Sequence, residues 1–270
     1  MRIGFFDSGI GGLSVLYEAL RQLPREDYLY YADDANVPYG NKSKEEIRCC
    51  VFEAVDFLAG MDIKALVVAC NTATSAAIQD IRQKYGFPII GMEPAVKPAI
   101  KSVDGKRVLV FATPLTLRES KFIGLLNQVD IHNAVDFLPL QELVIFAEAY
   151  QFDRVVILSY LKERLKDYDL NRYGAVVLGC THFAFFKNHI REIFPKDTVI
   201  VDGNRGTVQN LKNMLASMGK IHEGHGQVEY YRSGKRVMED YTMERYLLLL
   251  RQIENGSHHH ERTQKSVDSR

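Results

Sequence analysis

The sequence has no surplus of charge of either sign, because its 34 lysines and arginines balance 34 aspartates and glutamates. Proteins that bind nucleic acids or anionic membranes carry excess positive charge, so neither is an expected partner. Long apolar runs are also missing, since even the stretch Ala65–Cys70 is far shorter than the ~20 residues that span a bilayer. These absences exclude nucleic acid and membrane from the expected partners.

Cysteine is scarce as well: the chain has four, and none forms a Cys-x-x-Cys pair or a zinc-binding pattern with histidine. The first residues, Met1–Phe6, run directly into a strand pattern that is too short for a signal peptide. We therefore expect a cytoplasmic protein with reduced thiols and no metal. Cys49 and Cys50 lie within a helical pattern, where we expect both to be small core residues.

Short apolar runs alternate with amphipathic helical stretches, which is typical of an α/β fold with parallel sheets flanked by helices. With 46% hydrophobic residues, the 270-residue chain can bury one large core or two modest ones. The apolar runs predict strands at Ile3–Phe6, Leu29–Tyr31, Leu66–Ala69, Ile89–Gly91, Val108–Phe111, Val135–Leu138, Val176–Leu178 and Val199–Val201. The amphipathic stretches predict helices at Gly12–Leu23, Lys44–Ala59, Thr74–Tyr85, Phe152–Leu165, His182–Ile193 and Thr207–Met218.

The chain also contains an internal echo. The segment Ala65–Cys70 (ALVVAC) resembles Ala175–Cys180 (AVVLGC), so two predicted strands end in cysteine and lead into a helix. The segments Arg2–Ser8 and Arg107–Thr113 form a second pair, in which a hydroxyl residue follows the first strand of each half. We interpret the chain as a diverged tandem of one α/β unit.

This tandem predicts two pseudo-symmetric domains with the active site in the cleft between them. We place the first domain at residues 1–94 plus 205–255 and the second at residues 95–204, because two prolines in Glu93–Pro98 interrupt secondary structure between the halves. Residues 256–270 are polar and aperiodic, so we expect a disordered tail there.

Cys70 and Cys180 are the strongest candidates for chemistry. Ligands of open α/β sheets bind beyond the carboxyl ends of the strands, where both cysteines are expected. A helix N-terminus that follows a cysteine favours the thiolate, lowers the pKa below its ordinary value of ~8.5, and attracts a carboxylate. Inversion of a carbon stereocentre needs a base on one face and an acid on the other, and a thiolate facing a thiol supplies both. The sequence therefore indicates an enzyme that moves a proton on and off a carbon acid.

The first predicted strand ends at Asp7 and Ser8 and is followed by Gly9, Gly11 and Gly12. These glycines lack the spacing of a nucleotide-binding loop. We expect them to form a turn that lets Asp7 and Ser8 approach a small ligand.

Five motifs, in this order along the chain, resemble the glutamate racemase family of the aspartate/glutamate racemase superfamily. They are Phe6–Gly12 (FDSGIGG), Val37–Gly40 (VPYG), Cys70–Thr74 (CNTAT), Gly91–Ala95 (GMEPA) and Gly179–His182 (GCTH). The similarity covers about residues 2–218, and five motifs in one order are far more specific than any one of them.

The resemblance implies a homodimeric racemase that uses no pyridoxal phosphate or other cofactor and interconverts L- and D-glutamate for peptidoglycan synthesis. It implies that Cys70 and Cys180 alternate as base and acid, with Asp7 assisting Cys70 and His182 assisting Cys180. Besides Asp7 and His182, it implies that the glutamate site is lined by Ser8, Tyr39, Gly40, Asn71, Thr72 and Thr181. By the same resemblance, Thr74, Thr113, Thr116 and Glu148 are further residues of this site.

Two alternatives remain open. A related two-cysteine racemase can act on aspartate or a hydantoin, although Thr74 and His182 match the glutamate pattern. A non-catalytic small-molecule-binding protein can keep such a fold, although the complete set of proton-transfer residues favours catalysis. The chain departs from the family's usual residues at Asp34, Phe183, Ala184 and Gly203.

Overall fold

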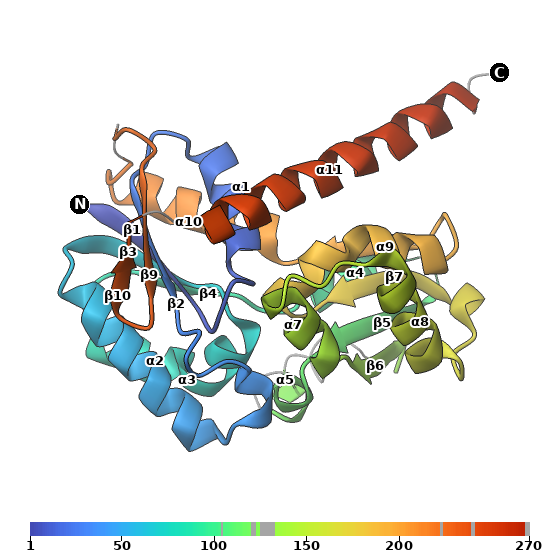
Figure 1. Cartoon of the computed structure of the whole chain (residues 1–270), viewed down its shortest axis with the longest axis horizontal. Coiled ribbons are helices and arrows are strands. Elements are labelled where there is room, and N and C mark those ends of the chain that lie inside the picture. The colour runs from blue at the N-terminus through green and yellow to red at the C-terminus, as the bar shows by residue number, and fades with distance from the viewer. Residues whose placement is uncertain (104, 120–122, 125–132, 222–223, 239–240, 268–270) are drawn as a thin grey trace.

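The computed structural model describes residues 1–103, 105–119, 123–124, 133–221, 224–238 and 241–267, with side chains up to residue 255. This part of the chain forms two lobes, each built around a mainly parallel sheet that is flanked by helices (Figure 1). The predicted α/β class is therefore confirmed. The division of the chain into domains at residues 94/95 and 204/205 stays a prediction.

The first lobe contains a six-stranded sheet in the order β10-β9-β2-β1-β3-β4. Its strands are β1 (Arg2–Asp7), β2 (Tyr28–Ala32), β3 (Ile63–Val68), β4 (Ile89–Gly91), β9 (Val228–Arg232) and β10 (Lys235–Val237). Its helices are α1 (Leu13–Gln22), α2 (Lys44–Ala59), α3 (Asn71–Lys84) and α10 (Asn204–Ser217), with a 3-10 turn η1 (Tyr39–Asn41). Every residue of β2 and β3 is buried, because helices cover both faces of this sheet.

The second lobe contains a four-stranded parallel sheet in the order β6-β5-β7-β8. Its strands are β5 (Arg107–Ala112), β6 (Val135–Pro139), β7 (Tyr173–Leu178) and β8 (Val199–Asp202). The helices are α4 (Val96–Ser102), α5 (Pro114–Arg118), α7 (Gln141–Glu148), α8 (Arg154–Leu165) and α9 (Lys187–Ile193), with 3-10 turns η2 (Leu170–Arg172) and η3 (Thr181–Phe186). A last helix, α11 (Tyr241–Val267), begins beside α1 and passes η3 and α9 (Figure 1).

The two sheets repeat the same pairing, down to its irregularities. The central strand β1 pairs with β3, and β5 pairs with β7 in the equivalent way. Each pairing shifts register after the first pair, between Arg2 and Ile3 in one lobe and between Arg107 and Val108 in the other. Beyond the strand ends, the Ala69 N–H donates to Phe6 and the Gly179 N–H donates to Phe111. The internal echo in the sequence is therefore a structural repeat.

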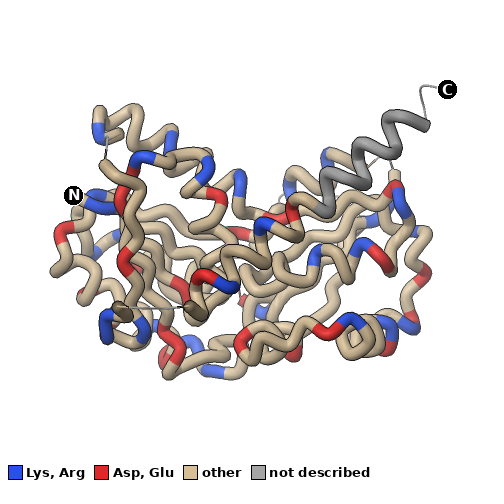
Figure 2. The backbone as a smooth tube through the Cα atoms, turned by 45° about the horizontal axis from the view of Figure 1, so that its top comes forward, with Lys and Arg blue, Asp and Glu red and all other residues tan. Residues whose placement is uncertain are grey.

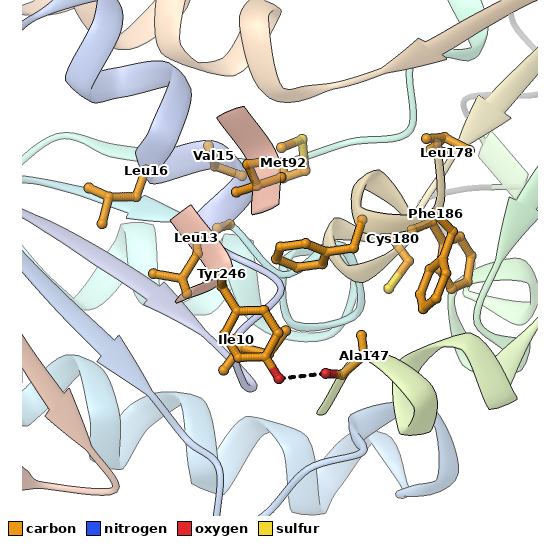
Figure 3. Packing of buried hydrophobic residues seen from close by; sticks show 14 of the residues in the cluster. Ile10, Leu13, Val15, Leu16, Met92, Ala147, Leu178, Cys180, Phe186 and Tyr246 are labelled. Carbon is orange, nitrogen blue, oxygen red and sulfur yellow. Dashed lines mark hydrogen bonds between the residues drawn. The ribbon is translucent and has the colours of Figure 1, made fainter. Parts of the chain in front are cut away.

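Apolar side chains from both lobes join in one continuous cluster (Figure 3). Helix α11 contributes Met243, Tyr246 and Leu250 to this cluster, and Ile253 is buried on the same face of the helix. The Tyr246 hydroxyl donates to the Ala147 carbonyl near the end of α7, at 2.6 Å. The C-terminal helix therefore fixes α7 from outside the sheets.

Several local features differ from what the sequence indicated. Helix α11 extends to Val267, into the segment from residue 256 where we expected a disordered tail, and the disorder of that tail stays a prediction. Strands β9 and β10 and helix α11 were missed. Cys49 is exposed rather than a core residue, whereas Cys50 is half-buried and packs against the cluster that contains Ile47 and Val51 of α2.

The structure accounts for three of the four residues that depart from the usual pattern of the glutamate racemase family. Asp34 pairs with Arg232 at 2.7 Å, Phe183 is fully buried in the core, and a Cβ at Gly203 would overlap the Met92 sulfur. Lys and Arg are interspersed with Asp and Glu over both lobes, as the balanced composition predicts (Figure 2). None of the helices that the structure describes combines the length and apolar character needed to cross a bilayer.

Candidate active site

The carboxyl ends of four central strands meet at the junction between the lobes. Asp7 is the last residue of β1, Thr113 directly follows β5, and Cys70 and Cys180 follow β3 and β7. Hydrogen bonds cross the junction: the Thr181 hydroxyl donates to Asp7 Oδ2 at 3.1 Å, and the hydroxyls of Thr72 and Thr113 lie 3.0 Å apart. Both cysteines are free thiols and are buried, with exposed fractions of 5% for Cys70 and 8% for Cys180.

Cys70 is the N-cap of α3. Its sulfur accepts the Ala73 N–H at 3.4 Å, and its thiol donates to Ser8 Oγ at 3.6 Å. Burial and the nearby Asp7 carboxylate outweigh these hydrogen bonds and raise the pKa of Cys70 to about 12. The expectation that the helix N-terminus lowers this pKa is therefore wrong for Cys70, which is a protonated thiol at neutral pH.

Cys180 lies next to a histidine–carboxylate pair. Its sulfur is 3.7 Å from Nδ1 of His182, and Nε2 of the same ring is 2.6 Å from Glu148 Oε1. Burial opposes a charged imidazole, but the hydrogen bonds and charges of Cys180 and Glu148 prevail and raise the His182 pKa well above its ordinary value. His182 is therefore a cation that can donate to the sulfur on one side and to the carboxylate on the other.

Asp7 lies near both cysteine sites. Its Oδ1 accepts the Gly9 N–H at 3.1 Å, while Oδ2 accepts the Thr181 hydroxyl. Burial raises the Asp7 pKa from 3.8 to about 6, and the Glu148 charge also raises it, although His182 and both hydrogen bonds act in the opposite direction. A carboxyl group that titrates near neutral pH can give and take protons during catalysis.

Three threonine hydroxyls form a buried cluster on the Cys70 side of the junction. Thr72, Thr113 and Thr116 lie within 2.9–3.2 Å of one another, and Thr113 is also the N-cap of α5. Hydroxyls can rotate to donate to an incoming carboxylate, so this threonine cluster can hold an anionic group.

The other expected site residues differ in what their side chains do. The Tyr39 hydroxyl donates to Asp33 at 2.6 Å and the Thr74 hydroxyl donates to the Val68 carbonyl, so both hydroxyls already have partners inside the protein. Asn71 is buried in the first turn of α3, and Gly40 lies in η1.

The glycines after Asp7 form a turn, and their lack of a side chain also leaves space for side chains of the second lobe. A Cβ at Gly9 would overlap the Glu148 carboxylate, and a Cβ at Gly11 would overlap His182 and Thr181. The Ile10 N–H donates to Glu148 Oε1 at 3.0 Å. Side chains from the second lobe therefore pack directly against this turn, which the sequence pattern alone did not indicate.

Two surface hollows, one around Arg107 and Tyr173 and the other around Tyr230 and Arg236, include neither cysteine. Both cysteines lie instead in the closed junction between the lobes. Within the described residues there is no group of three or more His, Cys, Asp or Glu placed to hold a metal ion.

Buried thiols at equivalent strand ends, each with acid–base neighbours, suit proton transfer to and from a carbon acid, and the comparison with known proteins identifies the class. The chain belongs to the Asp/Glu/Hydantoin racemase family, whose profile matches residues 11–211.

Within that family the similarity is to glutamate racemases. The chain is 53% identical to the glutamate racemase of Halothermothrix orenii over 255 residues, which are 94% of this chain and 100% of the relative. The glutamate racemase isoform of Bacillus anthracis is a structural neighbour with a TM-score of 0.76 and 30% identity, covering 85% of this chain and 86% of that one. The Francisella tularensis glutamate racemase, solved with D-glutamate, has a TM-score of 0.75 and 27% identity and covers 93% of both chains.

Proposed function

We propose that this chain interconverts L- and D-glutamate by moving the α-proton between two cysteine thiols without a cofactor. The observation that carries the proposal is the equivalent position of Cys70 and Cys180, each following the same strand of a repeated sheet at one buried junction. The similarity to glutamate racemases over nearly the whole chain supports glutamate as the substrate.

In this mechanism one sulfur acts as base and the other as acid. A thiolate removes the α-proton and forms an S–H bond, which leaves the electron pair of the C–H bond on the substrate as a carbanion. The opposite thiol gives its proton to the other face of that carbon and becomes a thiolate. The configuration is inverted, and the protonation states of the two cysteines are exchanged.

The neighbours of the two cysteines make the free protein asymmetric. Cys70 is protonated, because burial and Asp7 raise its pKa to about 12. Cys180 lies beside the cationic His182, which can pass a proton to or from its neighbours. We infer that Cys70 starts as the acid in the free protein, and that Asp7 and His182 redistribute protons between turnovers.

The polar groups of the junction suit the ammonium and carboxylate groups of glutamate. Asp7 is an anionic partner for the ammonium group, and Ser8 lies beside it. The threonine cluster and the N-terminus of α3, with Asn71 and Thr72 in its first turn, suit a carboxylate. Because both thiols are buried, the lobes must separate to admit substrate and close to exclude water, which strengthens every charge interaction in the site.

The proposal is tested by following the circular dichroism of L-glutamate with the wild-type protein, Cys70→Ala and Cys180→Ala. We expect the signal to decay towards zero with the wild type, and each variant to be slower by at least ~100-fold. Turnover of aspartate or a hydantoin in place of glutamate would overturn the substrate while keeping the mechanism. Glutamate binding without α-proton exchange would support a non-catalytic binding protein instead.

We also propose that the reaction supplies D-glutamate for peptidoglycan in the cytoplasm and that the chain works as a homodimer. Four free thiols suit a reducing compartment. Light scattering at several protein concentrations measures the oligomeric state, and a monomer at every concentration would contradict the dimer.

A further inference from the structure

Gln141 is a buried polar residue to which the proposed mechanism gives no role. It is the first residue of α7 and is only 9% exposed. The oxygen and the nitrogen of its side-chain amide are both shielded from solvent, and neither has a hydrogen-bond partner among the described residues. Buried amides are nearly always paired in folded proteins, so this one lacks a group that another molecule can supply.

The amide lies where the two lobes meet. A Cβ added at Gly40 would overlap Gln141 Oε1 and would lie 3.0 Å from Thr113 Cβ. Gln141 therefore faces η1 of the first lobe and the edge of the threonine cluster. Glycine at position 40 is what leaves room for the amide.

Helix α7 extends along the junction from Gln141 to Glu148. At its far end, Glu148 contacts His182 and the Ile10 N–H, close to Cys180. At its near end, Gln141 lies beside Thr113, whose hydroxyl is 3.0 Å from that of Thr72 in α3, the helix that Cys70 caps. One helix therefore reaches the surroundings of both cysteines.

We propose that Gln141 is a substrate-binding residue whose amide N–H donates to one carboxylate of the substrate beside the threonine cluster. This inference rests on the proposed racemisation of glutamate. In the complex the carboxylate supplies the acceptor that the amide nitrogen lacks, and rotation of the nearby Thr113 hydroxyl would supply a donor to the amide oxygen. A neutral donor adds specificity for a carboxylate without placing a fixed charge next to Cys70 and its acid–base neighbours.

Two variants separate binding from a structural role. Gln141→Leu keeps the volume and removes both polar atoms, whereas Gln141→Glu replaces the donor with an oxygen that repels a carboxylate. We expect KM for glutamate to rise about 10- to 100-fold in both variants, the range for a lost hydrogen bond to a charged group, with a smaller change in kcat. The unfolding temperature of Gln141→Leu should equal or exceed that of the wild type, because an unpaired buried amide has been removed.

Glu142→Gln is the matched control, because Glu142 is the next residue of α7, is exposed, and accepts the Tyr160 hydroxyl at 2.8 Å on the surface. We expect it to leave KM unchanged. A purely structural Gln141 would give the opposite pattern, with a lower unfolding temperature and an unchanged KM in Gln141→Leu, and that result would overturn the proposal.

Calorimetric titration with glutamate separates this inference from the proposed function. If the wild type binds glutamate but does not exchange its α-proton, racemisation fails, and the affinities of wild type and Gln141→Leu still decide the role of Gln141. Weaker binding by the variant supports the proposal. Equal affinities, or a wild type that binds no glutamate, overturn it.

Discussion

Replacing Asp7 with asparagine should make the protein more stable at neutral pH and nearly inactive. In the folded protein burial raises the Asp7 pKa to about 6, whereas its ordinary value is 3.8. A difference of about two pKa units corresponds to about 3 kcal/mol, since one unit is about 1.36 kcal/mol. This is the free energy that the fold gives up at neutral pH to keep an ionised carboxylate at the junction.

The pH dependence follows from the direction of this pKa change. A carboxyl whose folded pKa is raised binds its proton more tightly in the folded state, so wild-type stability falls as pH rises from about 4 to about 6. Asparagine lacks this titration and can keep both hydrogen bonds, because its oxygen accepts the Gly9 N–H and its nitrogen donates to a rotated Thr181 hydroxyl. The stability advantage of Asp7→Asn should therefore grow across this window and stay constant above it.

Urea unfolding of both proteins at several pH values between 4 and 8 measures this difference, and glutamate racemisation measures activity. We expect an advantage for the variant of about 3 kcal/mol above pH 6 and a loss of activity of ~100-fold or more. A variant that is less stable than the wild type by the same amount at every pH would refute the reasoning.

Three further substitutions test other parts of the structure. Gly11→Ala places a methyl group against His182 and Thr181, so kcat/KM should fall ~100-fold, and an active variant would contradict the packing of this turn. Cys180 and Glu148 together raise the His182 pKa, and Glu148→Gln removes the Glu148 charge, so the high-pH limit of the kcat/KM profile should move to lower pH, and an unchanged profile would count against the pair. Glu26→Ala leaves Lys64 buried without its 2.6 Å ion pair, so urea unfolding should show a loss of about 3–5 kcal/mol, whereas a loss below about 1 kcal/mol would refute the contribution of this pair.

The sheets and their repeat could be predicted from the sequence because they depend on local patterns. Strands that are buried on both faces read as apolar runs, and the two cysteine-ending runs were enough to anticipate the repeat. The pairing and the shared register of β1 with β3 and of β5 with β7 came only from the structure. Helix α11 was missed because its buried stripe, from Met243 to Ile253, begins among charged residues and ends in a polar segment.

The site was only partly predictable, because its electrostatics depend on contacts between distant segments. The motifs named the cysteines, Asp7 and His182, but whether a helix N-terminus or burial controls a thiol depends on tertiary packing, and burial dominates at Cys70. Gln141 belongs to none of the motifs, and only its proximity to Gly40 across the junction draws attention to it.

The central claim is that two different sulfurs serve the two faces of the substrate carbon. It is tested by incubating the wild-type protein with L-glutamate in deuterium oxide and measuring α-deuterium in both enantiomers at low conversion. The two-thiol account predicts deuterium in the D-glutamate formed and protium in the L-glutamate recovered, because the acid that delivers the new hydrogen has exchanged with solvent. Deuterium appearing equally early in the recovered L-glutamate would indicate one base that serves both faces, and would contradict the account.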